Sequence, residues 1–245
     1  MEPMKARLAR SAILFLHGLT SSGNTWAPLA RMASEHGAIV TAPDLRGHGE
    51  DPSSSGFRID DYATDVLAIA APAGGWDLVV AHSLGGTIAV RIASSNPHWA
   101  KRMLLLDPVI ELAQAAAEDA LADNLGALSN VVVDDVMRHN PLWSRETAEL
   151  KVRDVQQVTA DVVRQSIEAN LPWSLSPELA LVSATTLIIG ADPAMGAPSV
   201  GPDDGPILAG SMPHGRYEMA QGTSHSVHRD RPDIVFTAIT ELLHR

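Results

Sequence analysis

The sequence predicts an α/β fold in which helices flank a mostly parallel central sheet. Short strand-like runs alternate with segments of helical pattern along most of the chain, and such alternation produces parallel strands joined by crossover helices. Several of these runs are apolar at every position, as expected for strands covered on both faces. The chain has 245 residues, of which 45% are hydrophobic and 19% charged. This composition suits one substantial globular core.

The expected strands and helices follow one another in order along the chain. The strands are expected at Ala12–Leu16, Ala38–Thr41, Leu78–Ala81, Met103–Leu106, Thr186–Ile189 and Arg216–Met219. Helical patterns cover Thr25–His36, Ile59–Ala71, Leu84–Ser95 and a last segment near Asp233–Leu243. Strands are separated here by helices and not by tight turns, which favours parallel pairing.

Residues 108–183 break the alternation, because they show helical periodicity and little strand signal. A connection of this length between two strands is too long for a simple loop. We therefore expect a core domain formed by residues 1–107 and 184–245, with residues 108–183 inserted as a helical cap. Such a cap would cover the carboxyl ends of the strands, where open α/β sheets bind ligands. Extra helices on the side of the sheet are the alternative that periodicity leaves open.

Composition and charge exclude several classes of function. The formal net charge is −11, and an acidic surface repels phosphate backbones, so we expect no nucleic-acid partner. The chain has no cysteine, which removes thiolate nucleophiles and thiolate metal sites. Lys5, Arg7 and Arg10 precede the apolar run Ala12–Leu16, but that run is too short for a secretion signal. No stretch reaches the length of a membrane span. We expect a cytoplasmic protein that acts on a small molecule; its oligomeric state is not indicated.

The segment from Leu78 to Thr87 indicates a catalytic serine. It runs from an apolar strand through Ser83 into a helix, and small residues flank the serine at Ala81 and Gly85. A serine on a sharp strand-to-helix turn projects its hydroxyl above the sheet edge, at a helix N-terminus that favours developing negative charge. A serine that only caps the helix is the alternative, but a cap does not require small neighbours on both sides.

This segment resembles the nucleophile elbow of the α/β-hydrolase fold family, and in particular its serine esterase and lactonase members. Ala81 stands where the family pattern has its first glycine. The resemblance implies Ser83 as nucleophile and, from its order along the chain, His225 as general base on the loop before the last helix. It also implies an oxyanion hole formed by the backbone N–H groups of Leu19 and Leu84, because Leu19 follows the His-Gly pair that ends the first strand.

The acid that would orient His225 has two candidates, which both end strands. Asp192 follows the strand Thr186–Ile189 at the position that the family most often uses, and we favour it. Asp107 follows the strand Met103–Leu106 and is the rival, since some relatives draw their acid from that strand. Aspartates often end strands without any catalytic role, so spacing alone does not decide between them.

The resemblance implies a serine hydrolase that cleaves a small, fairly apolar carboxylic ester or lactone through an acyl-enzyme, with no cofactor and no metal. Trp26, Met137, Trp143 and Trp173 are candidates for the lining of an apolar pocket. A hydrolase of an amide, carbamate or carbon–carbon bond would use the same three residues. A receptor-like member of the fold that binds its ligand without sustained turnover is a further alternative.

Overall fold

The computed structural model describes residues 8, 10–129 and 131–244; Lys5 and Arg7 lie outside this part of the chain. Its main sheet has the strand order β2-β1-β3-β4-β7-β8, and every neighbouring pair is parallel. The strands are β1 (Ala12–Leu16), β2 (Ile39–Thr41), β3 (Leu78–His82), β4 (Arg102–Leu106), β7 (Thr185–Gly190) and β8 (Gly215–Met219). The predicted mostly parallel α/β sheet is therefore confirmed.

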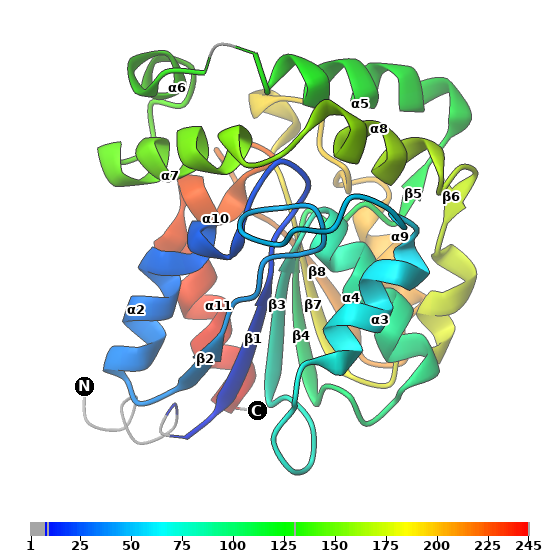
Figure 1. Ribbon diagram of the computed structural model, residues 1–245. Helices are drawn as coiled ribbons and strands as arrows, with labels where there is room; N and C mark the ends of the chain where they lie inside the picture. Colours follow the sequence, from blue (N-terminus) through cyan, green and yellow to red (C-terminus); the bar gives the residue numbers. More distant parts are fainter. Residues whose placement is uncertain (1–7, 9, 130, 245) are drawn as a thin grey trace.

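Helices cover both faces of this sheet (Figure 1). On one face lie α2 (Ala27–Glu35) and α11 (Pro232–His244), and on the other lie α3 (Ile59–Ala68), α4 (Leu84–Ser95) and α9 (Gly205–Gly210). Successive side chains of β1 alternate between two buried clusters, with Leu14 in one cluster and Phe15 in the other. This period of two is why a strand buried on both faces must be apolar throughout.

Four helices of the described chain, between residues 114 and 168, form a layer above the carboxyl ends of the strands (Figure 1). The layer contains α5 (Gln114–Gly126), α6 (Val133–His139), α7 (Arg145–Gln156) and α8 (Ala160–Glu168). A two-stranded antiparallel pair, β5 (Glu111–Leu112) with β6 (Trp173–Ser174), lies at its base, and the 3-10 helix η2 (Ser176–Leu181) leads back to the sheet. This segment is helical and lies where a cap was expected, whereas its division from the core as a separate domain stays a prediction.

The remaining short elements shape the loops around the sheet edge. They are the 3-10 helices η1 (Gly23–Trp26) and η3 (Pro193–Met195) and the single-turn helix α10 (Val227–Asp230). In the part of the chain that is described, no helix is long and apolar enough to cross a bilayer.

Candidate active site

Ser83 lies on the sharp turn between β3 and α4. Its backbone has φ 52° and ψ −118°, a conformation that L-residues rarely adopt and that persists only where the surrounding structure enforces it. The turn is held from two sides: the N–H of Ser83 donates to the carbonyl of Leu106, and its carbonyl accepts from Gly86 and Thr87. The side chain projects from the N-terminus of α4, which suits a nucleophile that develops negative charge next to it.

Glycines allow the close approach that this turn requires. A Cβ on Gly85 would lie 2.5 Å from the carbonyl oxygen of Leu16, and one on Gly18 would lie 3.0 Å from the Cβ of Ser83. The loop that follows β1 therefore packs directly against the nucleophile. The small residues expected around the serine have a physical cause in these contacts.

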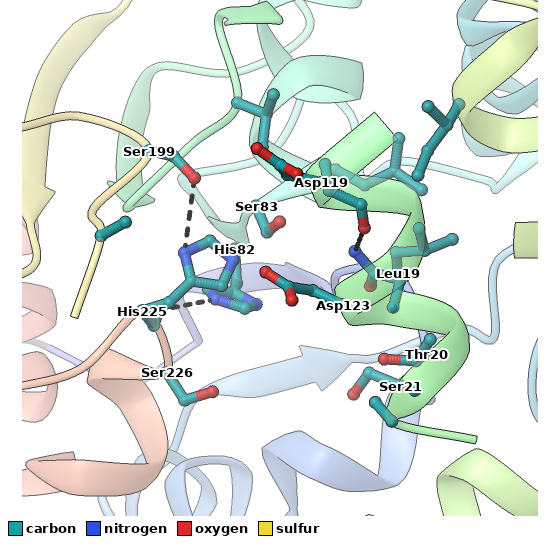
Figure 2. A pocket seen from close by; sticks show the side chains of 18 of the residues that line it. Leu19, Thr20, Ser21, His82, Ser83, Asp119, Asp123, Ser199, His225 and Ser226 are labelled. Carbon is teal, nitrogen blue, oxygen red and sulfur yellow. Dashed lines mark hydrogen bonds between the residues drawn. The ribbon is translucent and has the colours of Figure 1, made fainter. Parts of the chain in front are cut away.

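His225 lies on the loop before α10, and it lines the same cavity as Ser83. Figure 2 shows both side chains at this cavity. The Nδ1 of His225 lies 2.6 Å from the Oδ2 of Asp107. A carboxylate only accepts hydrogen bonds, so Nδ1 carries the proton and Nε2 keeps a lone pair for a base role. No hydrogen bond joins the Ser83 hydroxyl to this ring among the described residues, and such bonds often tighten only when substrate binds.

His82 is hydrogen-bonded to the loop that carries His225. Its Nε2 donates to the backbone carbonyl of His225 at 2.9 Å, and its ring lies between the rings of His225 and His228, at 4.7 Å and 4.5 Å between centroids. Burial holds the pKa of His82 and of His228 well below the ordinary value, and the neighbouring imidazoles lower both further. Both rings are therefore neutral at pH 7, and they support His225 without adding charge.

Asp107 is fully buried. Besides His225, it accepts from the N–H groups of Val200 at 2.9 Å, Ser199 at 3.0 Å and Ala191 at 3.4 Å. Its own backbone has a positive φ of 40°, which turns the side chain out of the line of β4. These donors satisfy the hydrogen-bonding capacity of a carboxylate that water does not reach. The arrangement suits an acid that orients His225.

Asp192, the acid favoured from the sequence, does not contact His225. Its carboxylate accepts from Gly222 N–H at 2.8 Å and from Ala194 N–H at 2.9 Å, and it caps η3. These two backbone hydrogen bonds lower its pKa. The expectation is corrected: both aspartates end neighbouring strands, but only Asp107 reaches His225. Asp192 instead joins the β7 turn to the loop that carries the histidine.

The expected oxyanion donors belong to two segments that meet at Ser83. Leu84 is the first residue of α4, and Leu19 belongs to the loop that packs on the serine. Within the described chain, neither backbone N–H makes a hydrogen bond. His17 fixes this loop, because its Nδ1 donates to Gly18 O and its Nε2 accepts from Leu45 N. Burial lowers the pKa of His17 to about 4, which keeps the ring in the neutral form that this pair of bonds requires.

A cavity of about 1080 Å³ opens over Ser83 and His225, below the helical layer. Apolar side chains form part of its wall: Leu19, Leu84, Val109, Leu112, Ile167, Trp143 and Trp173. Trp143 and Trp173 thus line the cavity as expected, whereas Met137 and Trp26 do not. Carboxylates also line it, from Glu111 on β5, Asp119 and Asp123 on α5 and Asp135 on α6; Figure 2 shows Asp119 and Asp123 facing inward.

A buried polar cluster next to the site was not expected from the sequence. Asp154 on α7 is fully buried and forms an ion pair of 3.2 Å with Arg229 on α10. Asp154 also accepts from the hydroxyls of Ser21 and Ser22, and Arg229 donates to Ser21 and to Thr25. These residues are far apart in the chain and no motif links them, so sequence patterns gave no signal for the cluster.

Comparisons with known proteins show which family this fold belongs to. A family model described as the alpha/beta hydrolase family matches residues 13–238. A putative esterase/lipase of Haemophilus influenzae is 23% identical over 253 residues, covering 99% of this chain and 86% of the relative. Lipase LipV of Mycobacterium tuberculosis is 36% identical over 101 residues, which are 41% of this chain and 38% of the lipase. This chain therefore matches less than half of LipV.

Solved structures give the same fold. An esterase from Exiguobacterium antarcticum superposes with a TM-score of 0.78 at 13% identity, covering 97% of this chain and 93% of the esterase. The enol-lactonase from Burkholderia xenovorans superposes with a TM-score of 0.74 at 20% identity, covering 96% of this chain and 92% of the lactonase. With the parallel sheet, the strained serine turn and a family match over nearly its whole length, the chain belongs to the alpha/beta hydrolase family.

Proposed function

We propose that the protein is a serine hydrolase of small, fairly apolar carboxylic esters or lactones, with Ser83, His225 and Asp107 as its catalytic triad. The observation that carries this proposal is the 2.6 Å hydrogen bond between the buried Asp107 and His225, which lines the same cavity as Ser83. It supplies a base of defined tautomer beside a preorganised serine. The relatives named as esterases, lipases and a lactonase support the same class of reaction.

In the acylation step, His225 Nε2 takes the proton of the Ser83 hydroxyl as the oxygen attacks the carbonyl carbon of the substrate. The negative charge moves to the carbonyl oxygen, where the N–H groups of Leu19 and Leu84 stabilise it. Each such donor contributes about 3–4 kcal/mol to the stability of the transition state. Asp107 holds the imidazolium that forms, and His225 then protonates the leaving alcohol oxygen.

In the deacylation step, the same groups act on water. His225 takes a proton from a water molecule, whose oxygen attacks the acyl carbon, and then returns a proton to Ser83 as the acid leaves. The sequence of steps calls on no metal and no cofactor. Because serine is the nucleophile, the intermediate is an ester that water can hydrolyse at its carbonyl carbon.

The cavity favours uncharged substrates. Its apolar wall, with Trp143 and Trp173, suits an aliphatic or aromatic acyl group, whereas the carboxylates on α5 and α6 repel anions. Among the described residues, the cationic side chains that line the cavity are Lys151 and Arg229, and both are already hydrogen-bonded to protein oxygens. We therefore expect short neutral esters and lactones to be better substrates than compounds that carry a free carboxylate. The expected cytoplasmic location stays a prediction.

The test is turnover of a panel of short aryl and alkyl esters, lactones and amides by the wild type and by Ser83→Ala. Ser95→Ala, at the far end of α4, is the matched control. We expect turnover of esters or lactones by the wild type and the control, and none by Ser83→Ala. Labelling of Ser83 by a fluorophosphonate checks the nucleophile independently of the substrate chosen. Turnover of amides alone would show that the protein cleaves amide bonds and not esters or lactones. A burst of product without steady turnover would favour a ligand-binding receptor. A failure of labelling would refute the serine mechanism.

A further inference from the structure

The loop after β1 is held by one face of helix α7. Lys151 Nζ donates to the carbonyl oxygen of Thr20 at 2.8 Å and to its hydroxyl at 3.0 Å. Asp154, three residues further along the helix, accepts from the hydroxyls of Ser22 at 2.5 Å and Ser21 at 3.3 Å. Positions three apart lie on the same side of a helix. Three consecutive loop residues are therefore bound by two side chains of one helix.

This loop segment needs such support. Thr20 has a φ of 56°, in the left-handed region that β-branched residues rarely adopt. It directly follows Leu19, whose free N–H points to an oxyanion role. Because only a few backbone torsions separate that N–H from the Thr20 carbonyl, a shift of the Thr20 carbonyl would redirect the Leu19 donor.

Lys151 occupies an environment that does not favour its charge. Burial lowers its pKa to about 7, and the nearby Arg229 guanidinium lowers it as well, whereas Asp154 raises it. His82 and His228, which also interact electrostatically with Lys151, are neutral because burial lowers the pKa of each ring. An apolar side chain would fill this position at a lower free-energy cost. The lysine is therefore better explained by the two hydrogen bonds to Thr20 than by the stability of the fold.

We propose that Lys151 is a positioning residue for the oxyanion hole: from helix α7 it holds Thr20 so that the Leu19 N–H faces the reacting carbonyl. The proposal rests on the serine-hydrolase function proposed above. It makes the helical layer part of the catalytic machinery, because the active oxyanion hole forms only when α7 is seated on the loop. The cluster of Asp154, Arg229 and Ser21 then joins α7 to the histidine loop as well.

Lys151→Met tests this, since methionine keeps the length of the side chain and removes the ammonium. We expect kcat on the best neutral ester to fall about 10- to 100-fold with KM changed less than about threefold, as for a misplaced donor. Fluorophosphonate labelling of Ser83 and binding of a boronic acid, which mimics the tetrahedral intermediate, should weaken by a similar factor. Arg153→Met, an exposed position on the same helix, should match the wild type in all three measurements.

A second variant and thermal melts protect this test against a folding defect. Lys151→Gln retains a shorter N–H donor and should give an intermediate loss, and both variants should melt close to the wild type. In the Lys151→Met background, Thr20→Ala should cause little further loss, because the two residues act as one unit. A kcat like that of the wild type, or a rise in KM confined to anionic esters, would overturn the positioning role. A wild type that is inert and unlabelled would instead overturn the hydrolase proposal together with this one.

Discussion

Replacing Asp107 by asparagine is the sharpest test of the triad, because the structure fixes what the amide would meet. In the wild type, Oδ2 accepts from His225 Nδ1 at 2.6 Å and from Ser199 N–H at 3.0 Å, while Oδ1 accepts from Val200 N–H at 2.9 Å. An amide NH₂ in the place of Oδ2 can only donate. His225 must then accept at Nδ1, which moves the ring proton to Nε2 and removes the base that faces Ser83.

The magnitude follows from this change of tautomer. The same substitution in a serine-protease triad lowers kcat by about 10⁴, so we expect a fall of about 10³- to 10⁴-fold, or about 4–5.5 kcal/mol in the activation barrier. The Ser199 N–H would also face an N–H donor, and a buried unpaired group costs about 1–3 kcal/mol of folding stability. The variant should therefore melt at a lower temperature but remain folded under assay conditions.

The assay is steady-state hydrolysis of the best neutral ester by the wild type, Asp107→Asn and Asp192→Asn, with thermal melts of all three. Asp192→Asn is the matched control, because an asparagine oxygen can still accept one of the two backbone hydrogen bonds that Asp192 makes; its kcat should stay within about threefold of the wild type. The reasoning is refuted if Asp192→Asn loses as much activity as Asp107→Asn, or if Asp107→Asn keeps more than about a tenth of kcat.

Three further predictions follow from the packing and charges of the site. Gly85→Ala should destabilise the fold by about 3 kcal/mol or more, because its Cβ would meet the carbonyl oxygens of Leu16 and His17 at 2.5 and 2.7 Å. Gly126→Ala, whose Cβ meets nothing within 4 Å, should instead stabilise helix α5 by about 0.5–1 kcal/mol. Denaturant unfolding measures both changes, and a Gly85→Ala protein more stable than Gly126→Ala would contradict the prediction. Burial lowers the pKa of His17 from 6.5 to about 4 in the folded protein. Its contribution to the free energy of unfolding is therefore complete above pH 6.5 and falls by about 3 kcal/mol as the pH decreases toward 4. His17→Gln should remove this part of the dependence of unfolding free energy on pH, and an unchanged dependence would contradict the prediction. The carboxylates of the cavity wall should give neutral esters a kcat/KM a few-fold higher than that of esters with a free carboxylate at low salt. This ratio of kcat/KM values should shrink as salt screens the exposed charges. A ratio near one in the double variant Asp119→Asn/Asp123→Asn would support the prediction, whereas a preference of the wild type for the anionic ester would contradict it.

The sequence predicted the sheet closely, and the reason lies in its burial. Ala12–Leu16 and Leu84–Ser95 match β1 and α4 residue for residue, because a strand buried on both faces must be apolar throughout and ends where polar turn residues begin. Among the elements that were not expected, β5, β6, α9 and α10 have two to six residues. Segments this short carry no periodicity, and tertiary contacts form them.

The sequence by itself also marked Ser83, His225 and Leu19 as candidates, because each has a local signal in small residues, a strand end or its place before the last helix, and all three line one cavity. The choice between Asp107 and Asp192 depended on features that no local pattern contains. A positive φ turns Asp107 toward His225, and three N–H groups from the β7 loop stabilise its charge, whereas the same loop directs Asp192 to Gly222. The contacts of Lys151, Asp154 and Arg229 likewise arise only when helix α7 lies on the β1 loop. Residue types and periodicity determine which helices and strands form. The packing of elements that are distant in the chain decides which charged side chains pair, because electrostatic interactions depend on distance in space.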